Sequence, residues 1–290
     1  MKSSLRKLTS ISVLVKLKPL LTTLCSSWST AATSVDRTVT NVSVNEDSAD
    51  TGTPSLSKPI DTGVARTILQ RGEIELLGRM PYSSNATFLT RIVDGEAAVN
   101  GIYKPAKGER PLWDFPPGLY RREIAAYELS EELGWGVVPP TVERVGPHGT
   151  GSVQLFIDAD FDQHHFTLVK NVKNHPALRK LCVLDLLANN TDRKSGHCLL
   201  SKWGTIYGID HGLCFSAEFK LRTVIWEFAN EPIGQELLCD IHRLAESVPP
   251  SVSPWLDQDE IDALLKRAQW LTESQVFPED DGYGWPWPLI

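Results

Sequence analysis

The chain of 290 residues has no excess of positive charge: 29 Lys and Arg residues stand against 36 Asp and Glu residues, a formal net charge of −7. General binding to nucleic acid needs a basic surface, so we expect no nucleic-acid partner. The negative balance does not exclude an anionic ligand such as ATP, because local groups hold such a ligand whatever the net charge.

Cysteine is scarce, odd in number and widely spaced, and no CxxC pair is present. The five residues are Cys25, Cys182, Cys198, Cys214 and Cys239. This pattern argues against a disulfide framework and against a cysteine-based zinc site. Reduced thiols are the simplest interpretation, and they predict a cytoplasmic location.

Long apolar runs are absent as well. The run Leu8–Val15 is too short to cross a bilayer, so we expect no integral membrane span. Residues 1–35 contain basic but no acidic side chains, and residues 26–65 are rich in Ser, Thr, Asp and Pro. Such a segment buries too little apolar surface to offset the entropy of ordering. We therefore predict a disordered or targeting-like extension over residues 1–65, with folded sequence beginning near Val64.

Residues 66–157 carry mostly strand patterns, and residues 158–290 carry mostly helix patterns. The predicted strands are 73–80, 86–93, 97–104, 141–145 and 151–157, with a helix at 121–133. Further helices are predicted at 175–188, 233–247 and 257–272. The sequence thus predicts an α+β fold with a small, β-rich N-lobe (66–157) and a larger, helical C-lobe (158–290).

Two short apolar runs flank Trp203 and Gly204 and predict a β-hairpin with these two residues as its loop. Counting outward from that loop places His197 opposite Asp210. Directly opposed residues in an antiparallel pair have Cα atoms roughly 4.5–5.5 Å apart. Asp192 lies on the loop that enters the same end, so two carboxylates and an imidazole are expected to converge.

This group of side chains suits phosphoryl transfer. One carboxylate can accept the proton of an acceptor hydroxyl, and another can hold Mg²⁺ against phosphate oxygens. Asp210 is the natural Mg²⁺ ligand, because Mg²⁺ prefers oxygen donors. Taken singly, Asp192 can instead cap a turn and His197 can be a structural histidine.

The motifs Asn190-Thr-Asp-Arg193 and Asp210-His-Gly212 resemble the catalytic loop and metal-binding triplet of phosphatidylinositol 3-/4-kinases and HipA-type kinases. The chain is also similar to an uncharacterised actinobacterial group distantly related to these kinases, which shares Tyr103-Lys-Pro105 and Pro111-Leu-Trp-Asp-Phe115. The resemblance implies a two-lobed protein-kinase-like fold, with ATP and Mg²⁺ as cofactors. It makes Asp192 the catalytic base beside Arg193, and it makes Asp210 a metal ligand. His197 takes the place of an asparagine that holds a second metal.

The nucleotide candidates lie in the predicted N-lobe. Lys104 ends the third strand and Glu123 opens the next helix, as a phosphate-binding lysine and its carboxylate partner do in kinases. An exposed lysine and a first-turn glutamate favoured by the helix dipole are the plainer alternative. A GxxxxGK[ST] motif is absent, so a P-loop NTPase is not supported.

The turn between the first two strands carries small polar residues, Ser83, Ser84 and Asn85. Their backbone N–H groups can approach phosphate oxygens, although an ordinary polar turn has the same composition. Gln154 begins the segment that the resemblance places at the hinge beside adenine.

The leading hypothesis is an ATP- and Mg²⁺-dependent kinase that moves a phosphoryl group to an unidentified hydroxyl acceptor on a protein, lipid or small molecule. A nucleotide-binding pseudokinase or scaffold without turnover is the second, and His197 is the residue that favours it. The third is a metal-dependent hydrolase that uses Asp192, His197, Asp210 and His211.

Overall fold

The computed structural model of the protein describes residues 59–81, 83–280, 282 and 284–289. The N-terminal part of the fold contains α2 (Thr62–Arg71), β1 (Glu73–Arg79), β2 (Phe88–Asp94), β3 (Ala97–Pro105), α3 (Leu119–Glu132), β4 (Thr141–Gly146) and β5 (Gly149–Leu155). The remainder contains α4 (His165–Leu168), α5 (His175–Ala188), β6 (Cys198–Leu200), β7 (Ile206–Gly208), α6 (Gln235–Glu246) and α7 (Gln258–Ser274).

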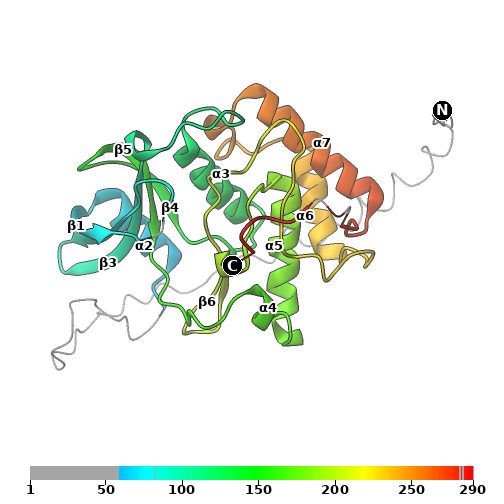
Figure 1. Cartoon of the computed structure of the whole chain (residues 1–290), viewed down its shortest axis with the longest axis horizontal. Helices are drawn as coiled ribbons and strands as arrows, with labels where there is room; N and C mark the ends of the chain where they lie inside the picture. Colours follow the sequence, from blue (N-terminus) through cyan, green and yellow to red (C-terminus); the bar gives the residue numbers. More distant parts are fainter. Residues whose placement is uncertain (1–58, 82, 281, 283, 290) are drawn as a thin grey trace, which may run out of the picture. The chain divides into compact units, whose positions relative to one another are not determined.

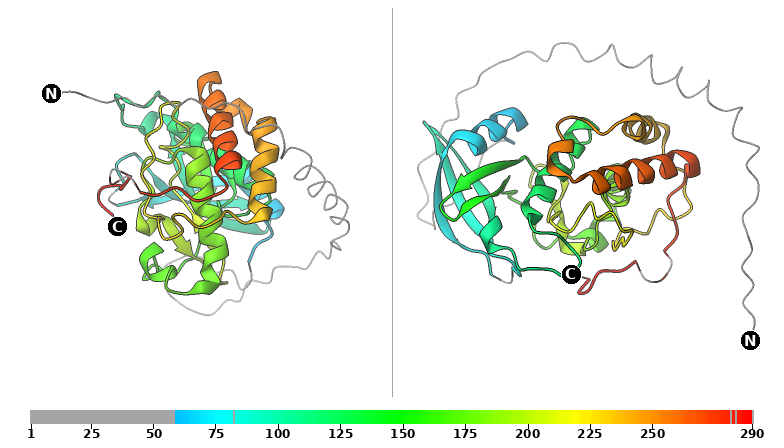
Figure 2. Two further views of the ribbon diagram at one scale, coloured as in Figure 1. Left: turned by 90° about the vertical axis from the view of Figure 1, so that its right-hand side faces the viewer. Right: turned by 90° about the horizontal axis from the view of Figure 1, so that it is seen from above.

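Strands β1 to β5 form one antiparallel sheet in the order β1-β2-β3-β5-β4 (Figure 1). Side chains alternate between the two faces of a strand, so Tyr103 and Lys104 on β3 point in opposite directions. Tyr103 joins a small buried cluster with Ile68 and Leu69 of α2, which packs against the sheet (Figure 2). Lys104 is thereby directed to the other face of the sheet.

Helix α3 follows β3 in the chain and packs against β4, β5 and α5. It begins after Gly118, which has a left-handed backbone with φ +91°. The carboxylate of Glu109 accepts hydrogen bonds from the backbone N–H groups of Gly118 and Tyr120, at 2.9 and 2.8 Å. These bonds satisfy helix-end donors that have no partner within the helix, and they fix the first turn, directly before Glu123.

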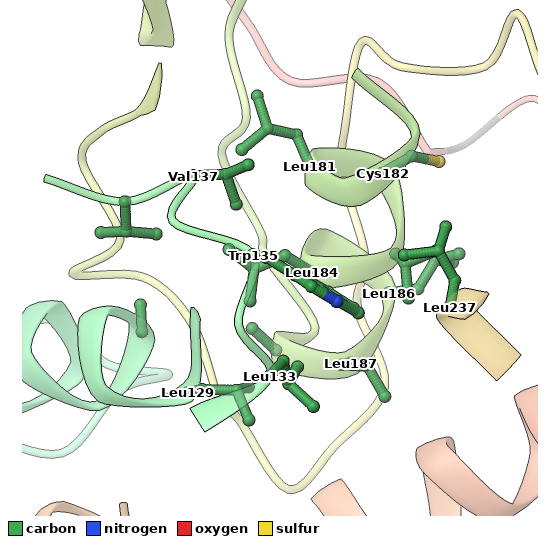
Figure 3. Close-up of a cluster of buried hydrophobic side chains, with 14 of the residues drawn as sticks. Leu129, Leu133, Trp135, Val137, Leu181, Cys182, Leu184, Leu186, Leu187 and Leu237 are labelled. Carbon is green, nitrogen blue, oxygen red and sulfur yellow. The ribbon is translucent and has the colours of Figure 1, made fainter. Parts of the chain in front are cut away.

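The larger buried cluster surrounds α5, whose side chains are apolar on most sides. Leu181, Leu184 and Leu187 of α5 meet Leu133 at the end of α3 and the indole of Trp135 (Figure 3). Helices α6 and α7 contact each other and contribute Leu237, Ile241 and Leu264 to this cluster. α5 is therefore a rigid base for the loop that follows it.

The hairpin of β6 and β7 has a longer loop than predicted, and its register differs by one residue. Cys198 pairs with Gly208, and the Ser201 N–H donates to the Thr205 carbonyl at 2.8 Å. Gly204 takes a left-handed φ of +86°, which closes a three-residue loop. The predicted two-residue loop and the direct pairing of His197 with Asp210 are therefore wrong. His197 accepts instead from the Ile209 N–H at 3.0 Å.

The predicted α+β fold is confirmed, and α5 has the predicted bounds. Helix α2 was not predicted, and its first residues, 62–65, overlap the predicted extension of 1–65; residues 1–58 of that extension lie outside the described part. The division into lobes at 66–157 and 158–290 stays a prediction. None of the helices in the described part is both long and apolar enough to span a membrane.

Candidate active site

One ammonium group joins three distant segments of the chain. Nζ of Lys104 on β3 donates to Oε1 of Glu123 on α3 and to Oδ1 of Asp210, the latter at 2.8 Å. The second oxygen of Glu123 accepts the backbone N–H of His211 at 3.0 Å. The predicted partnership of Lys104 with Glu123 is thus present in the structure, and it extends to Asp210, 106 residues further along the chain.

The charges of this group depend on one another. The ammonium of Lys104 holds the pKa of the Asp210 carboxyl well below its usual range. Burial alone would lower the pKa of Lys104, but Asp210 and Glu123 outweigh it and raise that pKa. Glu123 is almost fully buried, whereas the Asp210 side chain is 51% exposed. Asp210 is therefore an ionised carboxylate that faces both the lysine and the solvent.

Asp210 has a left-handed backbone, with φ +61°. Residues other than glycine rarely adopt this conformation, although aspartate tolerates it better than most. Such backbone positions cluster at functional sites. The turn directs the Asp210 side chain toward Lys104 and His197.

Asp192, on the loop between α5 and β6, has a half-buried carboxylate. Burial raises the pKa of Asp192, although the Lys194 ammonium, 3.1 Å from Oδ2, opposes this effect. The backbone N–H of Asp192 donates to Oδ1 of Asn190 at 3.0 Å, which sets the turn. The expected base therefore has a lysine beside it, and its expected convergence with Asp210 stays a prediction.

Arg193 lies in the interior, with no exposed side-chain surface. Its guanidinium pairs with the buried Asp185 of α5, with Nη2 and Oδ1 2.9 Å apart. It also donates to the carbonyl of Ile209 at 2.8 Å and to Nε2 of His211 at 2.7 Å. The role of Arg193 in catalysis stays a prediction. Its contacts place its side chain in the interior, between α5 and the segment that carries Asp210.

His197 approaches Asp210 with Nε2, 3.5 Å from Oδ2. Its Nδ1 accepts the backbone N–H of Lys194 at 3.4 Å, so in the neutral ring Nε2 carries the proton. Burial lowers the pKa of His197 to about 4, which keeps the ring neutral near pH 7. The ring is thus oriented as a donor toward Asp210, which does not fit a Mg²⁺ ligand, and its predicted metal role stays a prediction.

The turn between β1 and β2 is held by its own polar side chains. The Ser83 and Thr87 hydroxyls are 2.8 Å apart, and Asn85 Oδ1 accepts the Arg110 N–H at 2.9 Å. The amide of Gln154 is buried and donates to the Thr141 hydroxyl at 2.9 Å. These contacts leave the expected nucleotide roles of Ser83, Ser84, Asn85 and Gln154 untested.

The C-terminal tail returns to the site, which the sequence did not indicate. The backbone N–H of Thr223 donates to the Gly284 carbonyl at 2.9 Å, and that of Ser195 donates to the Leu289 carbonyl at 2.8 Å (Figure 1). Ser195 belongs to the segment after Asp192, and Thr223 to the segment after Asp210. The tail thus supports both carboxylate-bearing segments from outside.

Among the described residues, no three His, Cys, Asp or Glu side chains form a group that could hold a metal alone. His211 is fully buried against Arg193, so the four-residue set of the hydrolase hypothesis does not converge on one point. The partly exposed carboxylate of Asp210 fits a cation that takes its other ligands from phosphate and water, which is how proteins usually hold Mg²⁺.

No family model matches the sequence. The chain is 37% identical over 262 residues to Protein Rv2133c of Mycobacterium tuberculosis, a match that covers 77% of this chain and 94% of that protein. It is 30% identical over 181 residues to phosphatidylinositol 4-kinase gamma 4 of Oryza sativa subsp. japonica, which covers 53% of this chain and 29% of the relative. It is 28% identical over 157 residues to phosphatidylinositol 4-kinase gamma 3 of Arabidopsis thaliana, a match that covers 40% of this chain and 26% of the relative.

Two solved structures also resemble the chain, at 14% identity each. The Golgi casein kinase with Mn/ADP bound has a TM-score of 0.49, covering 79% of this chain and 80% of that one. Hydra Fam20 with sugar has a TM-score of 0.47, and the match covers 79% of this chain and 95% of that one.

Proposed function

The chain belongs to the family of Protein Rv2133c of Mycobacterium tuberculosis, and from the geometry of its site we propose that it is an ATP- and Mg²⁺-dependent phosphotransferase with a hydroxyl-bearing acceptor. The partial similarity to two plant phosphatidylinositol 4-kinases supports the reaction class. The observation that carries the proposal is the link from Lys104 to Glu123 and Asp210, since kinases place a strand lysine, a helix carboxylate and a metal-binding aspartate together.

Each side chain then has a definite task. Lys104, held by Glu123, donates to phosphate oxygens. Asp210 is the carboxylate that would hold Mg²⁺, which would neutralise charge on the transferring phosphoryl group. Asp192 orients the acceptor hydroxyl and takes its proton, and its raised pKa makes it a stronger base than an ordinary aspartate.

The order of elements supports a protein-kinase-like arrangement of these parts. A strand with the lysine (β3) is followed by a helix with its partner (α3), two more strands, and a buried helix (α5) that leads into the loop of Asp192. Under this arrangement the sheet would bind the nucleotide and the helical part would supply the catalytic loop. Whether the acceptor is a protein, a lipid or a small molecule stays open.

The second candidate is a nucleotide-binding protein without turnover. The observation that favours it is the ion pair between Lys194 and Asp192, because it occupies the carboxylate that would act as base. A lysine at this place can equally contact the transferred phosphate once ATP is bound.

Measuring γ-phosphate release and autophosphorylation with Mg²⁺ and ATP distinguishes the two. We expect turnover by the wild type and a loss of at least about 10²-fold in Asp192→Asn, since a positioned base contributes 10²–10⁴-fold. The isosteric amide keeps the turn, so ATP binding should survive in this variant. Equal turnover in both proteins would rule out Asp192 as the base, and ATP binding with no turnover in either would favour the second candidate.

A further inference from the structure

Helix α5 carries one charged group that has no contact with solvent. Asp185 is fully buried in a helix whose neighbouring side chains, Leu184 and Leu186, are apolar. A buried carboxylate is costly unless several donors satisfy it. Asp185 should therefore have a well-defined set of partners.

The partners come from both sides of the site. Oδ1 accepts from Asn190 Nδ2 at 2.9 Å and from Arg193 Nη2 at 2.9 Å, on the loop that carries Asp192. Oδ2 accepts from the Thr223 hydroxyl at 3.0 Å, on the segment that follows Asp210. One carboxylate thus binds the residues that flank Asp192 and a residue beyond Asp210.

Arg193 extends this contact to both chain neighbours of Asp210. Besides Asp185, its guanidinium donates to the Ile209 carbonyl at 2.8 Å and to His211 Nε2 at 2.7 Å. Ile209 and His211 are the two neighbours of Asp210 in the chain. The planar fork of arginine holds several acceptors in fixed directions, which lysine cannot do. The Asp185–Arg193 pair therefore holds the backbone carbonyl before Asp210 and the side chain after it.

The backbone around Asp192 is held in the same way. The N–H of Thr191 donates to the Leu213 carbonyl and that of Arg193 to the Arg222 carbonyl, each at 3.0 Å. The segments before and after each carboxylate are thus bonded to one another and to a single buried ion pair. A buried pair adds little stability compared with apolar residues, so its better-attested use is to specify one conformation.

We propose that Asp185 is a positioning residue that, through Arg193, sets the distance and orientation of Asp192 relative to Asp210. This rests on the proposed function for its effect on turnover, but its effect on the two segments can be measured without turnover. Asp185 itself touches neither nucleotide nor acceptor.

The test compares variants in the full chain. Asp185→Asn removes the charge, and Asp185→Asn with Arg193→Gln removes both charges. Thr223→Val removes one hydrogen bond to Asp185 and leaves the ion pair with Arg193. It is the mildest of the site variants and should fold even if the others do not. Leu264→Ala is the matched control, because it opens a cavity in the core at α7 and removes no hydrogen bond of Asp185 or Arg193. Hydrogen exchange of peptides covering 189–197 and 209–215 is measured together with ATP turnover per folded molecule.

We expect faster exchange in both peptides for the three site variants, but not for Leu264→Ala at a matched loss of melting temperature. In Asp185→Asn, kcat should fall by about 10²-fold while the KM for ATP changes little, since a misplacement of about 1 Å costs that much. The double variant should regain part of the melting temperature without regaining kcat.

Two outcomes overturn the inference. In the first, the rate of hydrogen exchange in both peptides is the same in every site variant as in the Leu264→Ala control. The other is a kcat that returns with the melting temperature in the double variant, which would make the pair merely structural. If the wild type shows no turnover, the proposed function fails, and the exchange data alone still decide the role of Asp185.

Discussion

The ammonium of Lys104 can be removed by substitution with methionine, which keeps the length and most of the apolar stem of the side chain. In the wild type this ammonium serves Glu123, which is 3% exposed, and Asp210, which is 51% exposed. Breaking a buried ion pair costs about 3–5 kcal/mol, whereas an exposed pair is worth about 0–1 kcal/mol. Because Glu123 keeps its bond from the His211 N–H, we expect Lys104→Met to lower the free energy of unfolding by about 2–3 kcal/mol.

The pH dependence of this loss follows from Asp210. Its pKa in the folded protein is depressed by Lys104, so the pair contributes stability at pH values above the ordinary aspartate pKa of about 3.9. That contribution disappears as the pH falls from there through the depressed pKa. The stability difference between wild type and Lys104→Met should therefore be full at pH 7 and should shrink below about pH 4.

Nucleotide binding provides the decisive assay. With Mg²⁺ and ATP at about 100 times the dissociation constant, the wild type should gain about 2.7 kcal/mol, which is roughly 5–10 °C in melting temperature for a domain of this size. Lys104→Met should lose most of that gain. The control is Lys202→Met, which breaks the ion pair between Lys202, in the loop of the β6–β7 hairpin, and Asp158, and which should keep the full shift. A full ATP shift in Lys104→Met would refute the assignment of Lys104 to the phosphates.

Two further predictions concern the base and the core. Asp192 must be ionised to accept a proton, and burial raises its pKa. In a pH profile, kcat/KM should therefore begin to fall at a pH above the ordinary aspartate pKa of about 3.9. The residual activity of Asp192→Asn should not show this fall at acidic pH. Leu184→Ala should lower the free energy of unfolding by about 2–5 kcal/mol, measured by urea denaturation, because Leu184 is fully buried against Trp135 (Figure 3); an equal loss of ATP affinity would contradict its purely structural role.

Much of the fold could be predicted because its signals are local. The strands and the helix α5 follow from side-chain periodicity, and α5 begins and ends where the pattern does. Helix α2 was missed because only a short stripe, Ala65, Ile68 and Leu69, is buried in it. Its capping residue Asp61, which accepts the Val64 N–H at 3.0 Å, was the available signal.

The buried network of the site could not be placed from local patterns, because its members meet only in three dimensions. One signal was nevertheless present: Asp185 is a charged residue within an apolar helix, and such a residue requires a partner. The sequence could not show which of several nearby cations supplies it. The kinase resemblance assigned Arg193 to the catalytic loop, and the structure shows that its side chain pairs with Asp185 of α5.

The hairpin brings the predicted neighbours together, although by a different route from the one predicted. A shift of one residue in register moves a side chain to the opposite face of a β-ribbon. With His197 opposite Ile209, a regular strand would carry Asp210 away from His197 and from Lys104. The left-handed backbone at Asp210 compensates, because it ends the strand and turns the carboxylate back to both groups. The left-handed backbone of Asp210 is thus the feature that brings its carboxylate to Lys104 and His197. The Asp185–Arg193 pair holds the residues on either side of Asp210 and so keeps Asp210 in this backbone conformation.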